Sequence, residues 1–439
     1  MVVNVAGLGA DLVSEMPSLA ALAGRGTCLP LEPVLPATTC PMQATLATGE
    51  TPARHGIVSN GLYFHDTAEV RFWEQSARLL GVPRVWEHAG GRRPKVALLF
   101  WQQSMYAPAD VLLTPKPVHL PDGEMVQDCY SRPADLYARL RAGPSSLEPD
   151  RPRGPFDLRH YWGPMAGLAS SRWIADASLE VWRSERPDLM LTYLPHLDYS
   201  GHRACPQSGA HRAAARELDA LLAPLLDAAR ADHARAIVLS EYSFVPVARP
   251  VALNRALREA GLVAVRETGG AEYAFPGDSR AFAVADNQVA HVHFPAAENL
   301  ASDVRKARRL LAQIDGVADV LDRDAMRERG LDHPRSGELV ALARPDAHFV
   351  YPWWTDPAKA PPFAHTVDIH AKPGFDAAEL FVDPETRSIP LSADCVRGSH
   401  GLVSDDGDGW GLFAVAPAPD EAAGRTALRA TDVAHWLLA

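Results

Sequence analysis

Short runs of consecutive apolar residues alternate with amphipathic segments along the first 250 residues. Strands are predicted over residues 2–5, 96–101, 189–194 and 236–240, each an apolar run of strand length. Helices are predicted near residues 17–23 and, with a strongly amphipathic pattern, over residues 211–232. Continuous apolar strands separated by helices are typical of a mostly parallel sheet with helices on both faces.

The pattern changes between residues 250 and 345, where shorter elements follow one another more closely. Helices are predicted over residues 253–260 and 304–314, and strands over residues 281–285, 291–294, 317–321 and 339–343. This βαβ-like block predicts a smaller α+β cap inserted into an α/β protein. The expected organisation is a catalytic core over residues 1–249, a cap over 250–345, and a return to the core over 346–439.

Charge and cysteine content narrow the class of protein. The net charge of −11 is negative, whereas proteins that bind a nucleic acid polymer carry an excess of basic residues, so no such partner is expected. No uncharged apolar run approaches roughly 18 residues, so neither a membrane span nor a membrane partner is expected. The five cysteines are scattered and lack CxxC spacing, which fits a reducing compartment and predicts a cytoplasmic location. The oligomeric state is not predicted.

A first candidate site lies between Pro36 and Asn60, where Thr39 is followed directly by Cys40 and Pro41. A hydroxyl that opens a helix benefits from the positive end of that helix, which favours an anion and a more acidic hydroxyl. Threonine still needs a base or a metal to become a nucleophile. The alternative is that these threonines only cap a buried helix.

Three further candidates follow apolar runs or stand between glycines. Asp198 and His202 are four residues apart and can face one cation, or instead form a local ion pair. Glu241 ends another predicted strand, where an acid serves a metal or caps a helix. His400 stands between Gly398 and Gly401, where backbone can approach a ligand closely. His365 and His370 are rivals of His400, His196 is expected to be structural, and His291 and His293 are expected on the cap surface.

In their order along the chain, these segments resemble the type I phosphodiesterase/nucleotide pyrophosphatase family of the alkaline phosphatase superfamily. The resemblance rests on Thr39-Cys40-Pro41, Thr48-Gly49, Pro52, His55-Gly56-Ile57, Asn60, Asp198 with His202, residues 240–243, and residues 398–401. It spans nearly the whole chain and implies an alkaline-phosphatase-like fold.

Carried over by position, the resemblance implies that Thr39 is the nucleophile and that Asn60 holds a non-bridging phosphate oxygen. Asp198, His202 and His400 match the first metal site of the family. A divalent metal is therefore expected there, with zinc as the first choice; two histidines and one carboxylate also suit non-haem iron.

The second metal site of the family is altered in this sequence. The aspartate that ends the first strand is replaced by Ala6, and an Asp-His pair is replaced by Glu241 and Tyr242. Alanine offers no ligand atom, and tyrosine is an uncommon zinc ligand. Glu241 and Tyr242 are the remaining candidates for a doubtful second site, which places the chain in a divergent subgroup.

The resemblance implies a metal-dependent hydrolase of a small phosphoester, phosphodiester or phosphonate, in which Thr39 attacks or positions a metal-activated water. The alternative is a catalytically impaired member that binds a phosphorylated ligand or a protein partner. Cleavage of sulfate esters is disfavoured because Cys40-Pro41 lacks the C/S-x-P-x-R context of sulfatases. The candidates for an apolar leaving-group pocket are Phe100, Trp101, Tyr106, Trp353 and Trp354, with ordinary packing as the alternative.

Overall fold

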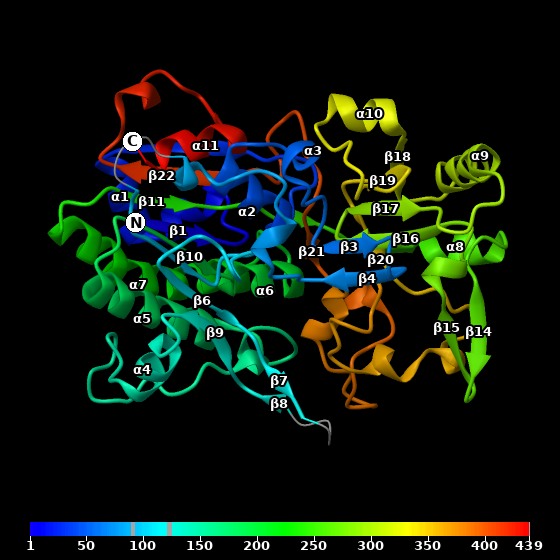
Figure 1. The fold of residues 1–439 in the computed structure, drawn as a ribbon, viewed down its shortest axis with the longest axis horizontal. Helices are drawn as coiled ribbons and strands as arrows, with labels where there is room; N and C mark the ends of the chain where they lie inside the picture. The colour runs from blue at the N-terminus through cyan, green and yellow to red at the C-terminus, as the bar shows by residue number, and fades with distance from the viewer. Residues whose placement is uncertain (89–92, 121–124, 439) are drawn as a thin grey trace.

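The computed structural model describes residues 1–88, 93–120 and 125–438. Within these residues the chain forms a nine-stranded sheet and, beside it, a four-stranded sheet (Figure 1). In spatial order, the strands of the large sheet are β23 (Leu428–Arg429), β2 (Thr27–Glu32), β22 (Gly411–Ala416), β11 (Ala236–Leu239), β1 (Val2–Val5), β10 (Leu189–Leu194), β5 (Val96–Leu99), β6 (Val111–Pro115) and β9 (Cys129–Arg132).

The centre of the large sheet is parallel. Strand β1 pairs in parallel with β10 and β11, and β10 and β5 continue the parallel order outward to β6. Strands β22 and β9 pair antiparallel with their neighbours. The four strands predicted from apolar runs in the core are thus confirmed, and they form the inner part of a mostly parallel α/β sheet.

Side chains on the two faces of the large sheet enter two separate hydrophobic cores. One core joins Val3 and Val5 of β1 to the helices of one layer, α1 (Pro17–Gly24), α5 (Leu168–Glu185) and α7 (Gly209–Ala231). The other core joins Val2 to the helices of the opposite layer, α2 (Thr39–Thr48) and α11 (Ala430–Trp436). Because successive residues of a strand point to opposite faces, the continuous apolar runs bury both sides of the sheet.

The four-stranded sheet is formed by residues of the predicted cap, which keeps that name below, and is antiparallel throughout. Its spatial order is β16 (Phe282–Asp286), β17 (Val289–His293), β19 (Leu339–Ala343) and β18 (Val317–Leu321). Helix α9 (Leu300–Leu311) connects β17 to β18, which run in the same direction with β19 between them. The cap helices also include α8 (Leu253–Glu259) and α10 (Arg323–Glu328).

The core and the cap lie side by side, with both chain termini in the core (Figure 1). The hairpin of β3 (Gly61–Phe64) and β4 (Glu69–Phe72) packs into the hydrophobic core of the cap, although it precedes the cap by nearly 180 residues. Phe375 and Val396 join the same hydrophobic core after the chain has left the cap sheet. The domain boundaries at residues 250 and 345 stay a prediction. The hydrophobic core of the cap includes segments that precede residue 250 and segments that follow residue 345.

Loops at the carboxyl ends of the central strands face the cap, which is where parallel α/β sheets carry their ligands. The short helix α6 (His196–Arg203) follows β10, residues 240–244 follow β11, and α2 begins at the same edge. Two short strands, β12 (Val245–Pro246) and β21 (Gly398–Ser399), pair beside them. Among the described residues, no helix combines the length and apolar character that crossing a bilayer requires.

Candidate active site

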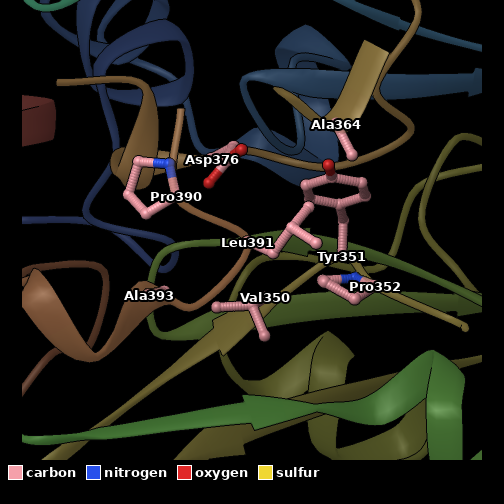
Figure 2. A pocket seen from close by; sticks show the side chains of 8 residues that line it. All are labelled: Val350, Tyr351, Pro352, Ala364, Asp376, Pro390, Leu391 and Ala393. Atoms are coloured by element: carbon pink, nitrogen blue, oxygen red, sulfur yellow. The ribbon is translucent and has the colours of Figure 1, made fainter. Parts of the chain in front are cut away.

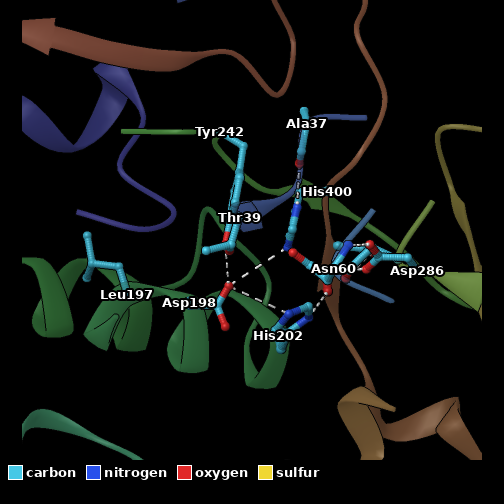
Figure 3. Close-up of polar contacts among 12 residues, drawn as sticks. Ala37, Thr39, Asn60, Leu197, Asp198, His202, Tyr242, Asp286 and His400 are labelled. Carbon is cyan, nitrogen blue, oxygen red and sulfur yellow. Dashed lines mark hydrogen bonds and ion pairs between the residues drawn. The ribbon is translucent and has the colours of Figure 1, made fainter. Parts of the chain in front are cut away.

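Three predicted ligands converge at the carboxyl end of β10. Asp198 and His202 lie one turn apart on α6, and His400 follows β21 (Figure 3). The Nε2 atom of His202 lies 3.8 Å from Asp198 Oδ1, and the Nε2 atom of His400 lies 3.9 Å from the same oxygen. One ligand atom from each residue lies within 4.8 Å of the others, so all three can reach one cation.

Backbone carbonyls fix the orientation of both imidazole rings. His202 Nδ1 lies 3.0 Å from the carbonyl oxygen of Gly398, and His400 Nδ1 lies 2.8 Å from that of Ala37. A proton on Nδ1 leaves the Nε2 lone pair of each ring directed at Asp198, and His202 Nε2 has no hydrogen-bond partner. A second ring nitrogen bound to a carbonyl is the usual arrangement of a metal-binding histidine. The three residues therefore fit a divalent metal.

Burial keeps the imidazoles neutral before any cation binds. It lowers the pKa of His202 to about 4 and that of His400 well below its usual range. The same burial raises the pKa of Asp198 to about 7, and the hydrogen bond from Tyr242 only partly offsets this. Neutral imidazoles bind metals without first releasing a proton.

Thr39 lies at the first position of α2, with its side chain nearly inaccessible to solvent. Its Oγ1 atom is 3.1 Å from the hydroxyl of Tyr242, which donates a hydrogen bond of 2.9 Å to Asp198 Oδ1. Thr38 occupies the N-cap position, but its side chain makes no capping hydrogen bond. The Thr39 hydroxyl is therefore directed towards the ligand cluster and does not cap the helix.

Asn60 lies beside the nucleophile segment and is held by the cap. Its Oδ1 atom accepts a hydrogen bond of 2.8 Å from the backbone N–H of Cys40. Asp286, at the end of β16, accepts hydrogen bonds from the backbone N–H of Asn60 at 2.8 Å and from its Nδ2 at 3.1 Å (Figure 3). Ser59 donates a further bond to Asp286. The cap thus orients the side chain expected to hold a phosphate oxygen.

Glu241 and Tyr242, the candidates for a second metal, are engaged within the protein. Glu241 Oε1 accepts hydrogen bonds of 2.5 Å from both Asn4 Nδ2 and Gln43 Nε2, and burial raises the pKa of Glu241 to about 8. The ring of Tyr242 stacks on His400, with centroids 3.5 Å apart and planes 2° from parallel. Neither residue belongs to the cluster of Asp198, His202 and His400, and their binding of a metal stays a prediction.

Comparison with known proteins identifies the family of this chain. The sequence profile of the type I phosphodiesterase/nucleotide pyrophosphatase family matches residues 1–376. The chain belongs to this family. An uncharacterized pyrophosphatase/phosphodiesterase of Schizosaccharomyces pombe is 24% identical over 253 residues, which are 56% of this chain and 44% of that protein. The chain therefore spans less than half the length of this curated relative.

Solved structures share the alkaline-phosphatase-like fold across almost the whole chain. A phosphonoacetate hydrolase from Sinorhizobium meliloti, in complex with phosphonoformate, superposes with a TM-score of 0.62 at 18% identity, covering 100% of this chain and 94% of that one. Murine ectonucleotide pyrophosphatase/phosphodiesterase 5 superposes with a TM-score of 0.59 at 16% identity, covering 99% and 93% of the two chains. At this level of identity the likeness establishes the fold.

Sequence reasoning missed some of the residues that build this family member's site. Asn4, Gln43 and Asp286 hold the side chains of Glu241 and Asn60. Gln43 lies inside the motif that contains Thr39. Asp286 directly follows the strand predicted over residues 281–285, so an acid after a predicted strand was the available signal. His291 and His293 were expected on the cap surface, which is wrong.

The two cap histidines are buried because β17 lies inside the cap sheet. His291 Nε2 lies 3.0 Å from the carbonyl oxygen of Val58, and its Nδ1 accepts a hydrogen bond from the backbone of Gly337. His365 and His370 are exposed and lie outside the ligand cluster.

The large aromatic side chains considered for a leaving-group pocket pack elsewhere. Those of Phe100, Trp101, Trp353 and Trp354 are at most 2% exposed, so ordinary packing is the correct alternative for these four. A hollow nearer the site is lined by Trp73, Trp162 and Phe375. The Phe375 ring lies 5.5 Å from that of His202, measured between centroids.

A second hollow lies within the cap and its return segment (Figure 2). Apart from Asp376, its lining is apolar or aromatic: Val350, Tyr351, Pro352, Ala364, Pro390, Leu391 and Ala393. Asp376 lines both hollows and binds the buried Lys372 at 2.8 Å. The ligand cluster does not line the hollow of Figure 2, which is therefore separate from the candidate active site.

Proposed function

We propose that this chain is a divalent-metal-dependent hydrolase of small phosphoesters, phosphodiesters or phosphonates, with Thr39 as its nucleophile. The observation that carries the proposal is the convergence of Asp198, His202 and His400 on one point, linked through the Tyr242 hydroxyl to Thr39. Residues from three distant segments meet there in a buried setting, and the Nε2 atom of His202 has no hydrogen-bond partner.

Asp198, His202 and His400 would hold the metal, with zinc as the first expectation because one carboxylate and two imidazoles suit it. When bound, the cation supplies Lewis-acid stabilisation of negative charge on the phosphoryl oxygens. Three protein ligands leave positions for a substrate, as catalytic zinc sites do.

The side chains of the protein perform the remaining steps of this proposal. Thr39 Oγ1 attacks phosphorus and gives up its proton, while the bond from phosphorus to the leaving oxygen of an ester, or to the leaving carbon of a phosphonate, breaks and the leaving group gains a proton. Water then hydrolyses the phosphorylated Thr39 and restores its hydroxyl. The amino end of α2 and the Asn60 side chain hold the phosphoryl oxygens, so that charge developing on them meets fixed dipoles. Overall, one water is consumed for each ester or phosphonate bond cleaved.

The substrate is proposed to be a small phosphorylated or phosphonate molecule. The phosphonoacetate hydrolase was solved with phosphonoformate and with phosphonoacetate, and an inactive form of the murine pyrophosphatase/phosphodiesterase was solved with AMP. The net charge of −11 makes a nucleic acid polymer a poor partner. The cytoplasmic location and the absence of a membrane partner remain predictions.

The test is hydrolysis of an aryl phosphodiester and of a phosphonate by the zinc-loaded protein, compared with the Thr39→Ala and Asp198→Ala variants. We expect Thr39→Ala to abolish turnover with the metal retained, and Asp198→Ala to abolish both. Asp227→Ala, a change at an exposed acid on α7, is the matched control for the lost carboxylate. Turnover that survives Thr39→Ala and Asp198→Ala would refute the mechanism, and an inert, metal-free protein would favour the catalytically impaired alternative.

A further inference from the structure

We propose that the Tyr242 hydroxyl takes the position of a second cation, so that the site holds one divalent cation per chain and Tyr242 positions the Thr39 hydroxyl. This inference rests on the proposed function and adds to it the number of cations and a positioning residue. It concerns Tyr242, which the resemblance offers only as an uncommon metal ligand.

The first step of the argument is the hydrogen-bond chain from Thr39 to Asp198. The Tyr242 hydroxyl is 2.9 Å from Asp198 Oδ1 and 3.1 Å from Thr39 Oγ1. A phenol has one proton, and the bond to the carboxylate uses it. In this arrangement Thr39 can donate its own proton to the Tyr242 oxygen, which leaves the lone pairs of Thr39 Oγ1 free to face an electrophile.

The second step is the rigidity of Tyr242. Its ring is 1% exposed and stacks in parallel on His400, a proposed ligand of the cation. Ser240 Oγ donates a hydrogen bond of 2.7 Å to the backbone carbonyl of Tyr242, and it accepts another from the N–H of Leu8. With backbone and ring both fixed, the hydroxyl has little freedom to leave the space between Thr39 and Asp198.

The third step is the shortage of ligands for a second cation. Ala6 follows β1 directly and has no ligand atom in its side chain. The Tyr242 oxygen already has two hydrogen-bond partners, and Glu241 Oε1 already accepts two amide hydrogens. Among the described residues around the position of a second cation, the side-chain atoms Glu241 Oε2 and Asn4 Oδ1 remain without hydrogen-bond partners. Two oxygens without an imidazole do not fit the nitrogen-containing sites that zinc prefers.

The deciding measurement is the number of cations per chain, obtained by removing metal with a chelator, adding zinc, and determining bound zinc after desalting. We expect one zinc for the wild-type protein and for Tyr242→Phe. A wild-type value of two would contradict this inference without contradicting the proposed function. A value of zero would refute the proposed function itself. Should the wild type bind two, Glu241→Gln would test whether the second cation uses Glu241 Oε2.

A variant that restores the missing ligands of a second cation tests the same inference by adding a binding site. Combining Ala6→Asp, Glu241→Asp and Tyr242→His removes the phenol and supplies two carboxylates and an imidazole. We expect the zinc content to rise from one to two per chain. If this variant folds, as judged by circular dichroism, and still binds one zinc, the view that Tyr242 and Ala6 exclude the second cation is overturned.

The positioning role is read from kinetics of the single Tyr242→Phe variant, which keeps the stacked ring. We expect kcat to fall about 10- to 100-fold because Thr39 loses its acceptor, with KM and zinc content unchanged. Tyr137→Phe is the matched control, since it removes another buried phenol, whose oxygen accepts a hydrogen bond from the backbone N–H of Phe156 and which lies outside the ligand cluster. An unchanged kcat in Tyr242→Phe would overturn the positioning role.

Discussion

The side chains at the end of β10 and those at the end of β11 lie next to each other, yet the protein satisfies them differently. After β10, His202 keeps an unpartnered ring nitrogen that faces a carboxylate. After β11, Glu241 and Tyr242 are joined to Asn4, Gln43, Thr39 and Asp198 by hydrogen bonds. The first group is preorganised for an external cation, and the second consists mainly of internal contacts. Neighbouring strand ends of one sheet can therefore differ in how far the protein itself satisfies their polar side chains.

Removing a ligand from the first group should have the largest effect. We expect His202→Ala to lower zinc affinity at least about 100-fold, beyond what loss of an outer-shell contact typically costs, and to abolish hydrolysis. Zinc titration against a competing chelator measures the affinity. His365→Ala is the control, because His365 is an exposed histidine outside the cluster. If His365→Ala gave the loss and His202→Ala did not, the ligand assignment would be wrong.

Disconnecting the cap should have a smaller effect that leaves the cation in place. We expect Asp286→Ala to lower kcat by about 10- to 100-fold, because Asn60 loses both of its hydrogen bonds to Asp286 and its side chain keeps the one from the backbone N–H of Cys40. Unfolding should become easier by about 1–3 kcal/mol, since Ser59 and Asn60 lose a buried acceptor. Steady-state kinetics, zinc content and urea unfolding report these three quantities separately.

Asp286→Asn is the matched control for this prediction, since it keeps the shape and one acceptor oxygen. It should retain more activity than Asp286→Ala. Equal loss in both variants would show that the charge of Asp286, rather than its hold on Asn60, matters. Loss of zinc in Asp286→Ala would contradict the separation between the cap contact and the ligand cluster.

Local patterns were enough to predict the central strands and α7. Strands β1, β5, β10 and β11 are continuous apolar runs, and a strand buried on both faces leaves that signal. Helix α5 was not predicted, and its buried face explains the omission. That face includes Ser170, Ser171 and Asp176, and Asp176 is paired with Arg153. Polar residues on the buried side erase the apolar period on which helix prediction depends.

The same limit applies to the site. The order of the motifs singled out Thr39, Asp198, His202 and His400, because each lies in a segment with its own local signal. The contact between Asp286 and Asn60 spans 226 residues and exists only because β16 packs against the core. Nothing near Asp286 in the sequence indicates its partner. Contacts made by tertiary packing alone were the part that could not be predicted.

The smallest predicted effect is a pH dependence of stability in the metal-free protein. Burial raises the pKa of Glu241 from 4.5 to about 8 and that of Asp198 from 3.8 to about 7. The folded state therefore holds these protons at a pH where the unfolded chain has lost them, and stability falls as pH rises through the folded pKa values. Buried histidines such as His202, with a pKa of about 4, act in the opposite direction, but only below the ordinary value of 6.5.

Between pH 6.5 and 8 the two buried carboxylates lower stability as pH rises, and the buried amino group of Met1 opposes them because burial lowers its pKa from 8.0 to about 5. We expect each of the two carboxylates to lower the free energy of unfolding by up to about 1.4 kcal/mol per pH unit, measured by urea unfolding in the presence of a chelator. Glu241→Gln should flatten the slope by removing one titrating group, whereas Asp227→Asn, at an exposed acid, should not. A wild-type slope that Glu241→Gln leaves unchanged would mean that Glu241 is already ionised in the folded protein. Glu241 would then carry a full negative charge, and the hydrogen bonds of Glu241 and Tyr242 would not replace a second cation.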